Sequence, residues 1–159
     1  MTKTIFRTMG ILVMALAVLG SVNLAIWVVD REPPIEYEGA HALSAKVPQG
    51  GSIDVEFSVF RKRICPVVTR RWLTDAKNER HSIPQYTVGL RLLAGRETYR
   101  RSITIPLSAA PGPAQYDVTL SYVCNPLQRI MNMPIEVSSP PVKFEVVPGE
   151  AGPIYSDDG

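Results

Sequence analysis

The sequence predicts an all-β domain, a sandwich of about seven or eight short strands, preceded by one N-terminal transmembrane helix. The first thirty residues contain a long apolar run without charge. After it, apolar residues recur at every second position in several short stretches, which is the period of a half-buried strand. The 14 prolines fall outside the first thirty residues, where they suit turns between strands better than helices.

The apolar run covers residues 8–29, which hold no charged side chain. As a helix rising ~1.5 Å per residue it would span about 33 Å, enough to cross a hydrocarbon core of about 30 Å. Lys3 and Arg7 precede it, and Pro33 and Pro34 prevent the helix from continuing. The positive-inside rule places residues 1–7 in the cytoplasm. We therefore expect a single-pass protein of a bacterial inner membrane with its C-terminal domain in the periplasm.

Two other interpretations of this run remain open. A signal peptide could be cleaved after 18–20 (Val-Leu-Gly), although the apolar run continues nine residues further. A buried helix of a soluble protein would need a polar face, and Asn23 is nearly the only strongly polar residue. Ala17, Ser21 and Ala25 form a ridge along which two membrane helices could approach closely. The simpler alternative is a monomeric anchor that contains small residues.

Strand-like alternation is clearest in residues 53–59 and 116–124, and each stretch follows a turn rich in Pro and Gly. Shorter alternating runs are 86–92, 103–107 and 142–146, and 74–79 is typical of a hairpin loop. We predict a linker over 30–40, the β domain over 41–148 and a flexible tail over 149–159. Two packed sheets are expected, with closure into a barrel as the alternative.

The chain has two cysteines, Cys65 and Cys124. Cys124 has the inward parity of its predicted strand, and outside the cytoplasm such a pair is oxidised to a disulfide. Two unpaired buried thiols are the alternative. Tyr122 precedes Cys124 by two residues, as in immunoglobulin domains, but Trp72 follows Cys65 too closely to be the usual core tryptophan. We therefore expect a domain that is Ig-like in architecture only.

The net charge of +2 conceals a strongly basic segment. Residues 61–101 hold eleven basic and three acidic side chains. If their strands are neighbours, the basic residues would form a patch for an anionic partner such as lipid headgroups or an acidic protein. The candidates are Arg61, Lys62, Arg63, Arg70, Arg71, Arg100 and Arg101. A solvated surface without a partner is the alternative, and nucleic acid is the least favoured partner because the domain is expected outside the cytoplasm.

The sequence offers few residues for catalysis or metal binding. His41 and His81 are the only histidines, and neither has metal-ligand spacing to the other or to a cysteine. We expect both on the surface or in a linker. None of the common nucleophile, metalloprotease, calcium or phosphate-binding motifs occurs. The sequence thus predicts no cofactor, no metal and no enzymatic activity.

Several segments resemble a group of uncharacterised small membrane-anchored proteins from phage, prophage and proteobacterial genomes. The resemblance covers roughly residues 22–147, and its most specific parts are Cys65 and the run 121–126, Ser-Tyr-Val-Cys-Asn-Pro. The group has no assigned activity. The resemblance implies that both cysteines belong to one recurring framework.

Together these features predict a non-enzymatic binding or scaffolding module at the cell envelope. The expected partners are membrane lipid and an envelope or virion protein. The alternative function is a structural component of a virion or envelope assembly that forms homo-oligomers through its helix.

Overall fold

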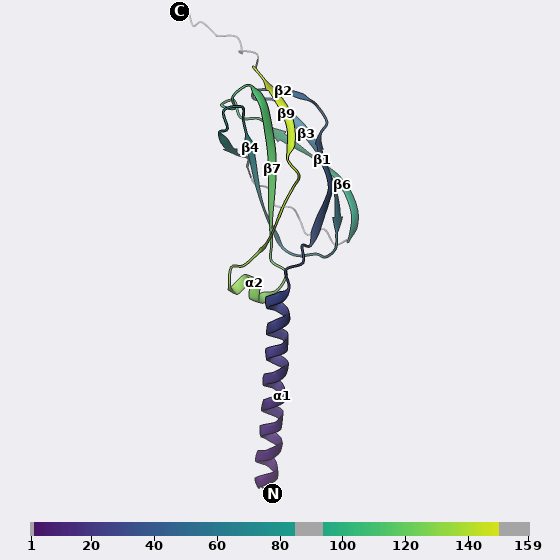
Figure 1. Cartoon of the computed structure of the whole chain (residues 1–159), viewed down its shortest axis with the longest axis vertical. Helices are drawn as coiled ribbons and strands as arrows, with labels where there is room; N and C mark the ends of the chain where they lie inside the picture. Colours follow the sequence, from purple (N-terminus) through teal and green to yellow (C-terminus); the bar gives the residue numbers. More distant parts are fainter. Residues whose placement is uncertain (1, 85–93, 150–159) are drawn as a thin grey trace, which may run out of the picture.

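The computed structural model describes residues 2–84 and 94–149, with side chains from Phe6 onward. One long helix, α1 (Thr2–Val29), leads into a β domain at its C-terminal end (Figure 1). The helix starts before residue 8, so it includes residues 2–7 of the predicted N-terminal segment. Its part Phe6–Val29 is long and apolar enough to cross a membrane and is not buried against the domain, although a signal sequence would meet the same criteria.

The described residues of the β domain form nine strands in two sheets. The first sheet has the order β1-β3-β6, with β1 (Ile35–Ala42), β3 (Ser52–Arg61) and β6 (Gly95–Thr104), all antiparallel. The second has the order β2-β9-β7-β4-β5, and β8 also pairs with β7. Its strands are β2 (Lys46–Pro48), β4 (Val67–Thr74), β5 (Arg80–Ser82), β7 (Gly112–Tyr122), β8 (Ile135–Ser138) and β9 (Val142–Val147). A short helix, α2 (Pro126–Ile130), follows β7.

One hydrophobic core is shared by both sheets, because the inward side chains of each strand pack against those of the other sheet. In β3 these are the apolar residues at alternate positions 53–59, as the sequence predicted. In β7 the alternate residues Ala114, Tyr116, Val118 and Leu120 are buried in the same way. The predicted β-rich fold with one N-terminal apolar helix is therefore confirmed, although the described residues form nine strands and not the predicted seven or eight, because short strands such as β2 and β8 carry no visible pattern in the sequence.

Some predicted boundaries are wrong. Residues 35–40 belong to β1 and not to a linker, because Ile35 is buried in the core and the segment pairs with β3 along its length. The connection between helix and domain is thus only residues 30–34. β6 ends at Thr104, before the predicted end at 107, and β7 ends at Tyr122, before Cys124. The predicted strand 86–92 and tail residues 150–159 lie outside the described residues.

The predicted hairpin loop over residues 74–79 is confirmed. It joins β4, which ends at Thr74, to β5, which begins at Arg80. Within it, the amide of Asn78 donates to the carbonyl of Asp75, and Asn78 has a φ of 65°, a left-handed conformation that asparagine tolerates.

Candidate functional site

The end of α1 is bonded directly to the segment that contains α2. The Asn125 side-chain amide donates to the carbonyl of Trp27 (3.3 Å), and the Gln128 amide donates to the carbonyl of Asp30 (2.9 Å). Gln128 is buried, and its Oε1 accepts a hydrogen bond from the amide of Cys124 (2.7 Å). The last carbonyls of a helix have no partner inside it, so these side chains fix the direction in which α1 leaves the domain. We call Asp30, Arg63, Asn125 and Gln128 the junction.

An ion pair supports the junction from the other side. Arg63 lies 2.8 Å from Asp30, and its guanidinium also donates to the carbonyl of Glu32. The amides of Lys62 and Arg63 donate to the carbonyl of Pro34. The short connection after α1 is therefore bound to the segment that follows β3, and it has little freedom to bend.

The disulfide partners that the sequence suggested are brought together. Cys65 and Cys124 are bonded, with 2.09 Å between their sulfur atoms, and they close a separation of 59 positions. Cys65 is buried. The bond joins the β3–β4 connection to the end of β7, immediately beside the junction.

The small-residue ridge of α1 is exposed along its whole length. The Ser21 hydroxyl donates to the carbonyl of Ala17 (2.9 Å), and the Asn23 amide donates to the carbonyl of Leu19 (3.0 Å). The Ser21 hydroxyl and the Asn23 amide are thus satisfied within the helix, so the face of Ala17, Ser21 and Ala25 does not need an interhelical hydrogen bond.

The seven basic candidates do not form one patch. Most of those on the first sheet, or in the segment that follows β3, are paired with acidic side chains. The pairs are Arg61 with Glu97, Lys62 with Glu32 and Glu36, Arg63 with Asp30, and Arg100 with Glu56. Arg101 lies over the ring of Tyr99, 5.2 Å from its centroid. Because opposite charges alternate on its outer face, the first sheet has little net potential to attract an anion.

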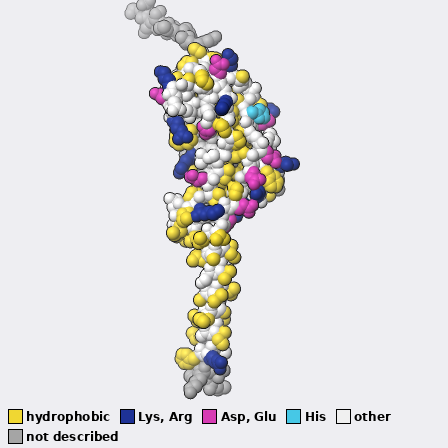
Figure 2. All heavy atoms as spheres, viewed as in Figure 1, with side chains coloured by type: hydrophobic (Ala, Val, Ile, Leu, Met, Phe, Trp, Pro, Cys, Tyr) yellow, Lys and Arg dark blue, Asp and Glu magenta, His cyan; other side chains and the backbone are white. Residues whose placement is uncertain are grey.

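Arg70 and Arg71 lie on β4, in the second sheet. Arg71 is buried and donates to the carbonyl of Pro84. Arg70 points outward, and among the described residues it forms no ion pair. Its neighbours on the outer face are Val68 and Trp72, and the guanidinium of Arg80 lies 5.5 Å from the ring centroid of Trp72. We call Val68, Arg70, Trp72 and Arg80 the β4 face. Figure 2 shows basic side chains along this edge of the domain.

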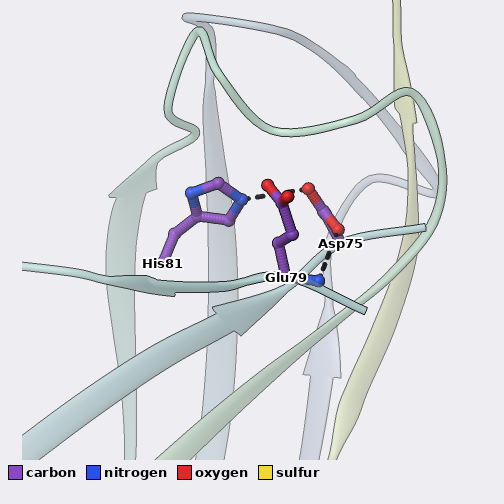
Figure 3. A group of neighbouring side chains, drawn as sticks. All are labelled: Asp75, Glu79 and His81. Carbon is purple, nitrogen blue, oxygen red and sulfur yellow. Dashed lines mark hydrogen bonds and ion pairs between the residues drawn. The ribbon is translucent and has the colours of Figure 1, made fainter. Parts of the chain in front are cut away.

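A second cluster, which the sequence analysis missed, lies in the β4–β5 hairpin (Figure 3). Asp75 is buried there. Its Oδ1 accepts from the amides of Lys77 and Glu79, and its Oδ2 accepts from the amide of Ala110, each at 2.9 Å. His81 Nε2 lies 3.0 Å from the same Oδ2. Burial raises the pKa of Asp75, but the hydrogen bonds from Ala110, His81, Glu79 and Lys77 outweigh it and hold that pKa below its usual value.

The cluster of Asp75, Glu79 and His81 has the donor types of a metal site. However, each oxygen of Asp75 already accepts two hydrogen bonds, and Glu79 is exposed. The arrangement therefore fits an anchor that fastens the hairpin to the loop containing Ala110. His81 is half-buried by this contact, so the prediction of a surface or linker position describes it poorly, whereas His41 is exposed on β1.

No family model matches the chain, and no curated protein matches it. Among solved structures, the chain is similar to the Pseudomonas fluorescens alkylpurine DNA glycosylase AlkC bound to DNA containing an abasic site analog. The TM-score is 0.43 at 12% sequence identity, and the match covers 77% of this chain and 33% of the glycosylase chain.

This comparison bears on two expectations from the sequence. The glycosylase is an enzyme and is bound to DNA, so the predictions that the present protein is not an enzyme and that nucleic acid is its least favoured partner find no support in it. We do not retain either prediction. A similarity of this extent, over a third of that chain, assigns no activity to the present protein.

Proposed function

We propose that this protein is a membrane-anchored module that binds or scaffolds a partner at the cell envelope. In this proposal α1 crosses a bacterial inner membrane, the Ig-like β-sandwich lies in the periplasm, and the gene belongs to the phage and prophage group that the sequence resembles. The observation that carries the proposal is the junction. An exposed apolar helix is bonded at its end to the domain through Asn125, Gln128 and Arg63.

The end of α1 supports a retained anchor over a cleaved signal sequence. Cleavage after residues 18–20 would leave residues 21–29 on the domain, and their side chains Val22, Leu24, Ile26 and Val28 are each more than half exposed, an apolar surface that suits a membrane and not water. Here the buried side chain of Gln128 donates to the carbonyl of Asp30. Asn125, also buried, reaches the carbonyl of Trp27, which lies inside the apolar run.

The β4 face is the surface best suited to the partner. The first sheet has most of its basic side chains paired with acidic ones, whereas the β4 face combines apolar surface at Val68 and an aromatic ring at Trp72 with the guanidinium of Arg70, which forms no ion pair with any described residue. Arg and aromatic side chains are enriched in protein interfaces. A cationic and aromatic surface of this kind fits an acidic surface on an envelope protein.

Site-specific photo-crosslinking in living cells tests the proposal. A photoreactive amino acid replaces Arg70 in the full chain, and the matched control carries it at Arg100. Arg100 is also an exposed arginine on the outer face of a strand, but it is paired with Glu56. A crosslink to a membrane or periplasmic protein at position 70, absent at position 100, is the expected result.

Three outcomes would contradict the proposal. Equal crosslinking at both positions would remove the role of the β4 face. Crosslinks only between copies of this chain would favour a structural assembly, and crosslinks to nucleic acid would replace the envelope partner. A C-terminal alkaline-phosphatase fusion checks the topology in the same cells, because it is active only if the domain is periplasmic.

A further inference from the structure

Three large apolar side chains lie exposed around α2, next to the end of α1. Ile130 is 79% exposed, Met131 is 58% exposed and Met133 is 43% exposed. We call these three residues the apolar rim. Figure 1 shows α2 beside the end of α1, at the base of the β domain, and Figure 2 shows that hydrophobic side chains continue from α1 onto this part of the domain.

We propose that the apolar rim is a lipid-contacting surface that inserts into the outer leaflet of the membrane crossed by α1. The part of the membrane that it contacts is the boundary between the phospholipid headgroups and the acyl chains. The inference rests on the proposed function, since it needs α1 to be a membrane anchor, and it adds a second membrane contact to the one made by the helix.

The position of the rim along α1 supports this assignment. The apolar part of α1, Phe6–Val29, has 24 residues and is about 36 Å long, which exceeds a hydrocarbon core of about 30 Å. Its last turn therefore lies at the membrane interface, where Trp27 is favourably placed. The hydrogen bond from Asn125 to the Trp27 carbonyl holds α2 at the same level.

The segment after α2 is also bonded to the chain just beyond α1, through Met133. Arg31, the second residue beyond α1, donates through Nη1 to the carbonyl of Met133 (3.3 Å). The amide of Met133 in turn donates to the carbonyl of Gln128 (2.9 Å). The rim is therefore bonded to the end of the helix at both Asn125 and Met133 and cannot move away from it freely.

Two basic side chains complete the surface. Arg129 is in the last turn of α2 and Arg31 follows α1, and both are exposed. Among the described residues neither guanidinium pairs with a carboxylate. Large apolar side chains beside arginines are typical of segments that lie in the interface, where the apolar groups enter the acyl boundary and the cations meet phosphate.

The opposite end of the domain provides a matched control. Leu107 is 78% exposed, almost the same fraction as Ile130, and it lies in the loop between β6 and β7. β7 begins after this loop and α2 follows the other end of the strand, so the length of β7 separates the two residues. If exposure alone decided which side chains contact lipid, Leu107 and Ile130 would do so equally. Insertion of the apolar rim predicts lipid contact at Ile130 and none at Leu107.

The test uses the full chain with its disulfide intact, reconstituted in vesicles of phosphatidylethanolamine and phosphatidylglycerol. Single cysteines at Ile130→Cys, Met133→Cys, Leu107→Cys and Val18→Cys are each labelled with an environment-sensitive fluorophore. Nitroxide-labelled lipids then quench the fluorophore, with the nitroxide either just below the headgroup or in the middle of the acyl chain. We expect blue-shifted emission and quenching by the shallow nitroxide at 130 and 133, and neither effect at 107.

The label at Val18, in α1, shows whether a negative result concerns the apolar rim alone or the proposed anchor as well. Quenching at Val18 by the deep nitroxide, without quenching at 130 and 133, would leave the anchor intact and overturn the lipid-contacting rim. Absence of quenching at Val18 would overturn the anchor and the rim together. Equal quenching at 107 and 130 would show that the domain adsorbs without a specific orientation, which also contradicts the inference.

Discussion

Single buried polar residues hold together parts of this chain that are far apart in the sequence. Asp75 joins the β4–β5 hairpin to Ala110, and Gln128 joins the disulfide segment to the end of α1. Neither role could be predicted from the sequence. An aspartate in a hairpin loop and a glutamine in a short helix are common on protein surfaces, and only the folded chain shows which distant amides they face.

We expect Asp75→Asn to destabilise the domain by about 1–3 kcal/mol, because the new amide group turns a donor toward backbone amides that need an acceptor. Urea unfolding of the full chain in detergent, followed by tryptophan fluorescence, measures the change. Asp54→Asn is the control, since Asp54 is an exposed aspartate on β3, and its effect should be small. An equal effect of both substitutions would contradict the anchoring role of Asp75.

Asp75 should also make the stability of the fold depend on pH. Its pKa in the folded protein lies below the ordinary value of 3.8, so the carboxylate stabilises the fold at pH values above about 4 and this contribution is lost as the pH falls further. Unfolding midpoints measured from pH 7 down to pH 3 should fall for the unmodified protein. In Asp75→Asn the decline should be shallower, and parallel curves would show that other groups cause it.

At the scale of elements, the sequence predicted the strands with clear alternation and the two strands beside the 74–79 hairpin loop, and it missed β2, β8 and most of β1. Residues 53–59 and 116–122 alternate because one face of each strand lies on the core and the other meets solvent. β1 was placed in a linker because its acidic residues and Gly39 resemble loop composition, although it pairs with β3 around a bulge between Tyr37 and Gly39. Three-residue strands such as β2 are too short for a period to be visible.

The disulfide is the strongest single constraint between elements that the sequence suggested. Because it closes a separation of 59 positions, we expect its loss to cost about 4 kcal/mol by restoring the freedom of the unfolded chain. Cys65→Ser with Cys124→Ser should lower the free energy of unfolding by that amount, measured by urea unfolding of the full chain in detergent. Non-reducing and reducing gels of the unmodified protein should differ in mobility, and identical migration would show that the bond does not form in the cell.

Substitution of Gln128 in the junction should loosen the connection between α1 and the domain. Gln128→Leu removes both the acceptor for the Cys124 amide and the donor to the Asp30 carbonyl. We expect faster hydrogen exchange at the Cys124 amide and a broader distance distribution between spin labels in α1 and on β9. Arg129→Ala, one residue further and exposed, should leave both measurements unchanged.

At the scale of the whole molecule, helix and domain are joined by the connection of residues 30–34 and by the hydrogen bonds of the junction. If α1 is retained as an anchor, protein purified from the membrane fraction should contain peptides that cover residues 8–29. Mass spectrometry of that fraction checks this expectation. A chain that begins at Ser21, after the 18–20 cleavage signal, would show that the helix is removed.

The sequence indicated the apolar helix and the β domain but not which basic side chains share a surface. The basic segment 61–101 suggested one patch, whereas the fold divides its arginines between two sheets and pairs most of those on the first. Net charge along a chain does not show which side chains share a face. Among the described arginines of this segment, Arg70 and Arg80 lie on the outward surface that also carries Trp72.

In the proposed function, the short connection after α1 would also limit where a partner can be met. A domain held on its helix by the junction would present the β4 face at a nearly constant height, within the length of about 36 Å that β7 reaches with 11 residues at ~3.3 Å each. A partner anchored in the same membrane would then search for this face by lateral diffusion in two dimensions. A partner whose acidic surface lies further from the bilayer would be out of reach, so geometry as well as charge would select the binding protein.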